Sequence, residues 1–227
     1  MAASAHPRPH DETTPVTGIR ILTDISALQT RPAYDGLGRY WQASLRALQA
    51  IAGDDLEHIL VANGHLGTPG DIPFKDHGAW RLHYADYPVH EYSPSAWRAA
   101  VGPYRAYWRA LLDRLKPDIV HIYAPFDWRL PLHSLGDSRP IVVTVHDLCS
   151  FQLRVAFQRQ APDWELAASR HTAQWLKGAA ALMATSAEIR HTLIEQLEIR
   201  EDRVHLAEAA PTPATAALGS PGVARLL

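Results

Sequence analysis

Short apolar segments alternate with longer amphipathic ones along the chain from Gly18 to about residue 210. Short apolar runs bounded by polar residues or proline predict strands, and apolar residues that recur every three or four positions predict helices. Two runs, 118–123 (DIVHIY) and 140–146 (PIVVTVH), are rich in Val and Ile, as is typical of strands buried in a parallel sheet. The alternation predicts an α/β fold: a Rossmann-like, doubly wound parallel sheet of about seven strands with helices on both faces. The predicted strands span residues 19–24, 56–61, 80–84, 118–123, 140–146, 180–184 and 203–206.

Helical spacing of apolar residues predicts the segments between these strands. Residues 37–51 form an amphipathic pattern, and 163–177 form another. Residues 97–115 share one apolar face, but Gly102-Pro103 is expected to divide them into two helices. Thr185-Ser186-Ala187-Glu188 matches a capping box and predicts the start of a last helix.

The two ends of the chain differ from this pattern. Residues 1–17 are rich in Pro, Thr and His without an apolar period, which predicts a disordered tail. Residues 211–227 are rich in Pro, Ala and Gly and are interpreted as a linker toward an absent carboxyl-terminal domain. The predicted organisation is therefore one domain over 18–210. The first residues have no apolar core of the kind found in signal peptides, so a cytoplasmic protein is expected.

Composition limits the classes of molecule that this protein is expected to bind. The 22 basic and 24 acidic residues are scattered and give a net charge of −2, so nucleic acid is a poor candidate. No apolar run is long enough to span a bilayer, and membrane association is compatible with the sequence but not indicated by it. Cys149 stands alone, and the 13 histidines have no spacing typical of zinc ligands, so no metal site is expected.

Ligands of such sheets bind beyond the carboxyl ends of the strands, so the loops that follow strands carry the candidate chemistry. Gly36 and Gly38 stand at the start of a predicted helix, where backbone N–H groups can approach an anion; a simple loop-to-helix turn explains them equally well. The segment after the 118–123 strand places aromatic rings beside a carboxylate and a guanidinium, which suits a sugar, although rings that merely cover the sheet edge would look the same. Its candidate residues are Tyr123, Phe126, Asp127, Trp128 and Arg129.

His146 and Asp147 follow the 140–146 strand directly. An imidazole at that position can hydrogen-bond a substrate or help to manage developing charge. A His-Asp pair also occurs for structural reasons, so the residues alone leave both roles open.

Several segments in register resemble the amino-terminal domain of the retaining GT-B glycosyltransferases of family 4, over about residues 19–210. The resemblance is carried by the strand at Ile19 and by four motifs that follow it: Gly36-Leu37-Gly38-Arg39-Tyr40, Lys116 to His121 (KPDIVH), Thr144 to Leu148 (TVHDL), and Ala184 to Glu188 (ATSAE) leading to Asp202-Arg203-Val204. The chain departs from the family at Ala207 to Ala210, where Asn-Gly is common.

This resemblance implies an enzyme, a glycosyltransferase of the hexosyltransferase type, that transfers a sugar from a nucleotide-diphosphate sugar to a glycan or small-molecule acceptor. Gly36 and Gly38 would face the donor diphosphate, and His146 would contact the transferred sugar. The acceptor pocket would include the loops after Asp24 and Tyr123, together with Asp147, Arg154 and Arg159. The family generally works without a bound metal or other cofactor, and no Asp-x-Asp motif is present here.

The donor-binding carboxyl-terminal domain would be supplied in cis or as a separate chain, and this chain alone is expected to be inactive. Two alternatives remain open. One is a non-catalytic module that binds a glycan or a phosphorylated metabolite, and the other is half of a GT-B-like nucleotide-sugar epimerase.

Overall fold

The seven predicted strands form one parallel sheet in a computed structural model of the chain. The structure describes residues 18–25, 29, 36–52, 55–63, 80–85, 94–123, 125, 139–148 and 163–208. The strand order is β3-β2-β1-β4-β5-β6-β7, and every neighbouring pair is parallel. The α/β prediction is confirmed. The strands are β1 (Ile19–Asp24), β2 (Leu56–Asn63), β3 (Trp80–Ala85), β4 (Ile119–Ile122), β5 (Ile141–Val145), β6 (Ala181–Ala184) and β7 (Val204–Leu206).

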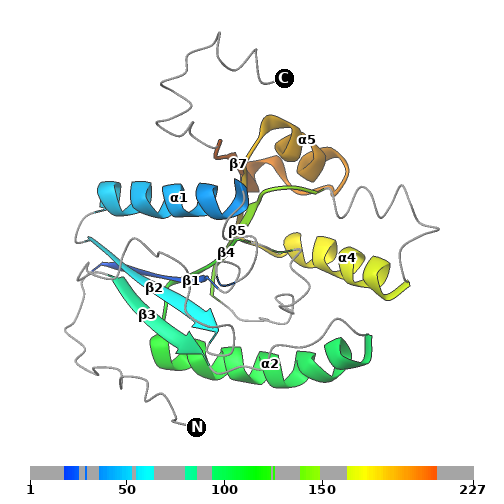
Figure 1. Cartoon of the computed structure of the whole chain (residues 1–227). Helices are drawn as coiled ribbons and strands as arrows, with labels where there is room; N and C mark the ends of the chain where they lie inside the picture. Colours follow the sequence, from blue (N-terminus) through cyan, green and yellow to red (C-terminus); the bar gives the residue numbers. More distant parts are fainter. Residues whose placement is uncertain are drawn as a thin grey trace.

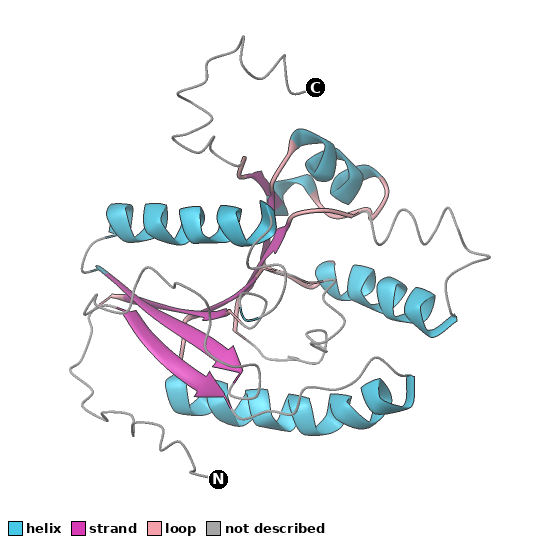
Figure 2. Ribbon diagram, in the orientation of Figure 1, coloured by secondary structure: helices cyan, strands magenta, loops and turns pink. Residues whose placement is uncertain are grey.

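Helices cover both faces of this sheet, as the doubly wound prediction requires (Figure 1, Figure 2). Helix α1 (Gly36–Ala52) packs on one face through Trp41 and Leu45, which join Leu60 in a small apolar core. Helices α2 (Pro94–Leu115), α4 (Asp163–Leu176) and α5 (Ala187–Glu195) contribute to the larger core on the other face. A short 3-10 turn, η5 (Glu201–Arg203), leads into β7.

Helix α2 corrects the prediction that Gly102-Pro103 would divide the segment into two helices. One helix runs from Pro94 to Leu115 with Pro103 inside it. Pro103 is exposed, so its ring does not intrude on the core. The buried side chains of Trp108 and Leu112 hold the later turns against the sheet, which offsets the local cost of the proline.

The start of α5 corrects a second detail. The capping residue is Ser186, whose hydroxyl accepts a hydrogen bond from the backbone N–H of Ile189 at 3.2 Å. Thr185 was expected to cap the helix, but its hydroxyl instead donates to the carbonyl oxygens of Val145 and His146. The segment therefore lacks the predicted capping box, and Thr185 ties the end of β6 to the end of β5.

Polar side chains inside the sheet are paired across neighbouring strands. Glu57 of the fully buried strand β2 forms a 2.7 Å ion pair with Arg20 of β1. Thr23 and His58 lie on the same two strands, with Oγ1 and Nε2 2.6 Å apart. The predicted disordered tail (1–17) lies outside the described residues, as does the predicted linker (211–227), and the domain boundaries remain predictions.

Candidate functional site

The carboxyl edge of the sheet brings together residues from distant parts of the sequence. Strand β4 ends one residue before Tyr123, and β5 ends one residue before His146. The first turn of α1 begins at Gly36 and includes Gly38, which is buried. Because the strands are parallel, the segments that follow them emerge at the same edge, and α1 starts there too (Figure 1).

A group of aromatic and imidazole rings, hereafter the ring cluster, occupies this edge. It consists of Tyr40, Trp41, His121, Tyr123 and His146. The rings of Tyr40 and His146 make a T-shaped contact with centroids 4.7 Å apart, and the ring of Tyr123 is stacked relative to that of His146 with centroids 6.1 Å apart. Tyr123 also contacts Trp41 at 5.1 Å and His121 at 4.3 Å. A ring of α1 therefore contacts the histidine that follows β5, and a ring that follows β4 lies near it.

Side-chain hydrogen bonds fasten the backbone around the ring cluster. The hydroxyl of Thr185 donates to the carbonyl oxygens of Val145 at 3.3 Å and His146 at 3.2 Å. The hydroxyl of Tyr40 donates to the carbonyl oxygen of Ala207 at 2.7 Å, just past the end of β7. Nε2 of His121 lies 2.9 Å from Oγ1 of Thr144 on β5. The exits of β5 and β6 are thus linked to each other, and the exit of β7 is linked to α1.

Burial sets the protonation states of this cluster. Burial, reinforced by the positive charge that His146 can carry, lowers the pKa of His121 to about 3. Burial raises the pKa of Tyr123, the neighbouring Tyr40 raises it further, and a hydrogen bond with Ser44 has the opposite effect. Burial also raises the pKa of Tyr40, again with an opposing hydrogen bond to Ser44. At neutral pH, His121 is therefore uncharged and both tyrosine hydroxyls remain hydrogen-bond donors.

Gln29 belongs to the segment after β1 that was expected in the acceptor pocket. Its amide nitrogen donates to the carbonyl oxygen of Asn63 at 2.7 Å, and its amide oxygen accepts from the backbone N–H of Asn63 at 2.6 Å. Asp24, at the end of β1, is 7% exposed. The pair of hydrogen bonds joins Gln29 to the end of β2, at the same edge as the ring cluster.

The structure assembles part of the predicted site. Tyr123 and His146 lie together, the turn that holds Gly36 and Gly38 is at the same edge, and Asp147 is exposed beside His146. The roles predicted for these residues stay predictions. The remaining candidates, Phe126, Asp127, Trp128, Arg129, Arg154 and Arg159, lie outside the described residues.

Tyr40 and His121 also belong to the ring cluster, but they were assigned no role from the sequence. A signal was available for His121, because it alternates with Tyr123 along a buried strand and so points to the same face of the sheet. Tyr40 lies one helical turn beyond Gly36, and only the packing of α1 across the sheet brings it to His146.

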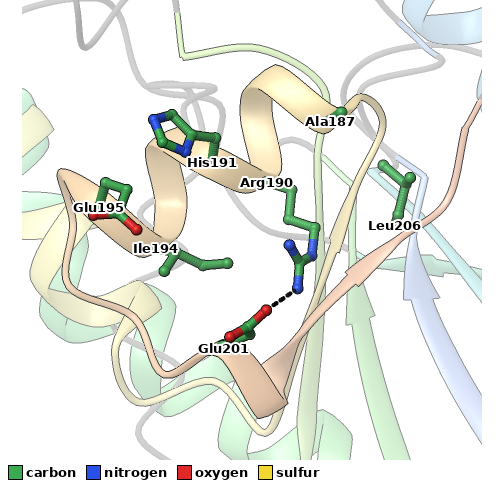
Figure 3. Close-up of a pocket in the computed structure, with 7 residues that line it drawn as sticks. All are labelled: Ala187, Arg190, His191, Ile194, Glu195, Glu201 and Leu206. Carbon is green, nitrogen blue, oxygen red and sulfur yellow. Dashed lines mark hydrogen bonds and ion pairs between the residues drawn. The ribbon is translucent and has the colours of Figure 1, made fainter.

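A separate pocket of about 350 Å³ lies between α5, η5 and β7 (Figure 3). Arg190 and Glu201 span it with a 2.7 Å ion pair. None of the candidate catalytic or binding residues predicted from the sequence lines this pocket, so it is not part of the candidate site. Its lining comprises Ala187, Arg190, His191, Ile194, Glu195, Glu201 and Leu206.

No helix in the described part of the chain is long and apolar enough to cross a membrane. The same residues contain no group of three or more His, Cys, Asp or Glu side chains placed to hold a metal ion.

Sequence comparison identifies one family. The model of Glycosyltransferase Family 4 matches residues 34–208, which include the whole ring cluster. A comparison with curated proteins gives no match.

Solved structures share the fold at low sequence identity. A UDP-N-acetylglucosamine 2-epimerase superposes with a TM-score of 0.55 and 11% identity over 89% of this chain and 55% of its own. Sucrose-phosphate synthase from Thermosynechococcus elongatus gives 0.54 and 15% over 84% of this chain and 48% of its own. UGT73P12 from Glycyrrhiza uralensis, complexed with glycyrrhetinic acid 3-O-monoglucuronide, gives 0.51 and 8% over 86% of this chain and 49% of its own. The chain thus spans about half the length of the structures it matches.

Proposed function

The chain belongs to Glycosyltransferase Family 4, and from this premise we propose that it is the acceptor-side domain of a retaining glycosyltransferase. In this proposal the enzyme transfers a sugar from a nucleotide-diphosphate sugar to a glycan or small-molecule acceptor. The cleft of the enzyme is the carboxyl edge of the sheet, where parallel α/β sheets bind their ligands.

The observation that carries the proposal is the placement of His146. It follows β5 directly, its carbonyl oxygen accepts from Thr185, and its ring contacts that of Tyr40 and lies near that of Tyr123. A side chain held in this way loses little further conformational entropy when it binds a substrate. In this proposal His146 contacts the transferred sugar, and its imidazole hydrogen-bonds that sugar as charge develops at the reacting carbon.

The first turn of α1 supplies the second element of the proposal. The amino terminus of a helix carries partial positive charge and backbone N–H groups without intrahelical partners, which favour an anion. Gly36 and Gly38 leave this turn without bulky side chains, so a diphosphate can approach the backbone closely. Tyr40, two residues beyond Gly38, contacts His146 and brings the phosphate-facing turn to the sugar-facing imidazole.

The loops around this edge receive the acceptor in the proposal. Gln29 is held at this edge by its two hydrogen bonds to Asn63, and the exposed Asp147 lies beside His146. Because such loops vary more than the scaffold they extend from, they determine which acceptor is used.

A product assay tests the function. The enzyme is incubated with a panel of nucleotide-diphosphate sugars, with and without candidate acceptors, and products are identified by mass spectrometry and proton NMR. We expect an acceptor-dependent glycoside with the anomeric configuration of the donor. An epimerised nucleotide sugar formed without acceptor would favour the epimerase alternative, and ligand binding without conversion would favour a binding module.

A further inference from the structure

Tyr40 connects three segments that meet at the carboxyl edge of the sheet. Its backbone belongs to α1, its ring makes a T-shaped contact with the imidazole of His146 at an angle of 84° between the rings, and its hydroxyl donates to the carbonyl oxygen of Ala207. Strand β7, which Ala207 follows, is the outermost strand of the sheet beyond β6. One side chain thus spans the start of α1, the exit of β5 and the exit of β7.

The contact with Tyr40 constrains the ring of His146. His146 follows the last residue of β5, so its own backbone lies outside the strand and is held by the hydroxyl of Thr185. The imidazole ring can still rotate about its side-chain torsions. The T-shaped contact with the ring of Tyr40, with centroids 4.7 Å apart, restricts that rotation, and the hydroxyl bond to Ala207 fixes Tyr40 itself.

We propose that Tyr40 is a positioning residue, whose ring orients the imidazole of His146 toward the sugar and whose hydroxyl holds that ring in place through Ala207. This inference rests on the proposed function, because Tyr40 acts through His146. It makes Tyr40 part of the catalytic arrangement without contact with the substrate. Small errors in the position of a reacting group are costly, since a misplacement of about 1 Å can lower a rate roughly 100-fold.

A purely structural role is the competing explanation. A partly buried tyrosine that packs against a core stabilises the fold wherever it lies, and its removal lowers the amount of folded enzyme. Tyr107 of α2 provides the matched control, because it too is a partly buried tyrosine and packs against the core on the opposite face of the sheet.

The experiment compares Tyr40→Phe, Tyr40→Leu, Tyr107→Leu, His146→Ala and the double variant Tyr40→Leu/His146→Ala in the active enzyme. Turnover at saturating nucleotide sugar, KM for the nucleotide sugar and thermal stability are measured for each. We expect Tyr40→Leu to lower kcat roughly tenfold or more, because it removes both the ring and the hydroxyl. Tyr40→Phe keeps the ring and is expected to lose less, and Tyr107→Leu is expected to alter stability with kcat within about threefold of wild type.

The double variant decides whether Tyr40 acts through His146. If it does, Tyr40→Leu lowers kcat in the wild-type background but not in the His146→Ala background, because contacting residues that work as a unit are not additive. An equal loss in both backgrounds, or wild-type kcat for Tyr40→Leu, would overturn the inference while leaving the proposed function intact. Wild-type kcat for His146→Ala, or an enzyme that transfers no sugar, would refute the proposed function and this inference together.

Discussion

Nε2 of His121 lies 2.9 Å from the hydroxyl oxygen of Thr144, across the β4–β5 pair. Thr23 and His58 make the corresponding contact across the β1–β2 pair, at 2.6 Å. Each histidine is thus paired with a threonine on a neighbouring strand, on the side of the sheet that α1 covers. Buried polar groups of this kind cost free energy when they lose their partners, so both pairs matter to stability.

Thr144→Val is expected to lower the free energy of unfolding by roughly 1–3 kcal/mol, because it leaves Nε2 of His121 without this partner in a buried setting while keeping the side-chain shape. Urea denaturation followed by circular dichroism measures the change. Thr172→Val, at a buried threonine of α4, is the matched control. A stability for Thr144→Val equal to wild type would show that the contact contributes nothing.

Acid is expected to destabilise the domain through the same histidines. Burial lowers the pKa of His58 to about 3, with His121 adding to the effect, and burial lowers the pKa of His121 to about 3, with His146 adding to it. Both values lie below the 6.5 of an unfolded chain, so the unfolded state binds more protons as the pH falls. The stabilising contribution is complete above pH 6.5 and is lost between that value and about 3, at a slope of up to roughly 1.4 kcal/mol per histidine per pH unit.

Denaturation midpoints measured between pH 7.5 and 5 test this dependence. His121→Gln should make the loss of stability between those pH values smaller, because one of the two buried imidazoles is gone. His205→Gln, at an exposed position of β7, serves as the control. If His121→Gln and wild type lose the same stability on acidification, the buried imidazole is not the source of the acid sensitivity.

Most of the fold could be predicted because strands buried in a parallel sheet, and the helices that cover it, have recognisable local patterns of apolar residues. The Val- and Ile-rich segments that became β4 and β5 are examples, as is the amphipathic repeat of α1. Pro103 and Thr185 were interpreted wrongly because their effect depends on tertiary context. Packing carries α2 through the proline, and the neighbouring exit of β5 offers Thr185 carbonyl acceptors that a local capping pattern cannot reveal.

The candidate site was only partly predictable for a similar reason. His146 and Tyr123 follow strands, and the rule for parallel sheets places such residues at one edge. Tyr40 lies inside a helix, where the sequence pattern indicates only that its ring packs. Its link to His146 and Ala207 depends on where α1 crosses the sheet, which the sequence of α1 does not specify.

Gly18→Ala is expected to be destabilising by roughly 1–3 kcal/mol, because overpacking against rigid backbone is costly. A Cβ added at Gly18 would lie 2.5 Å from the carbonyl carbon of Asp55, where β1 and β2 begin side by side. Gly178→Ala is the matched control, since the backbone atom nearest to its added Cβ, the carbonyl oxygen of Trp175, would lie 3.3 Å away. Urea midpoints compare the two, and equal stability of both variants would contradict the steric argument.

His146→Ala is expected to lower turnover roughly 100-fold or more in the active enzyme, a typical contribution of a positioned acid-base or polar group. The residue as a whole is only half-buried, so the fold should remain intact when its side chain is shortened. Steady-state kinetics and circular dichroism measure the two effects. A folded variant with near-normal turnover would assign His146 a structural role only.

Residues 1–227 by themselves are expected to bind nucleotide-diphosphate sugars weakly and to transfer none. The chain spans about half the length of the solved structures it matches, and its ring cluster and the first turn of α1 form one side of the proposed cleft. A small-molecule site typically encloses about 70–90% of its ligand, which one wall cannot achieve. Calorimetric titration with a panel of nucleotide sugars, beside a product assay with candidate acceptors, measures both properties. Micromolar donor affinity or repeated turnover by these residues would mean that the edge around His146 binds the donor without a second wall.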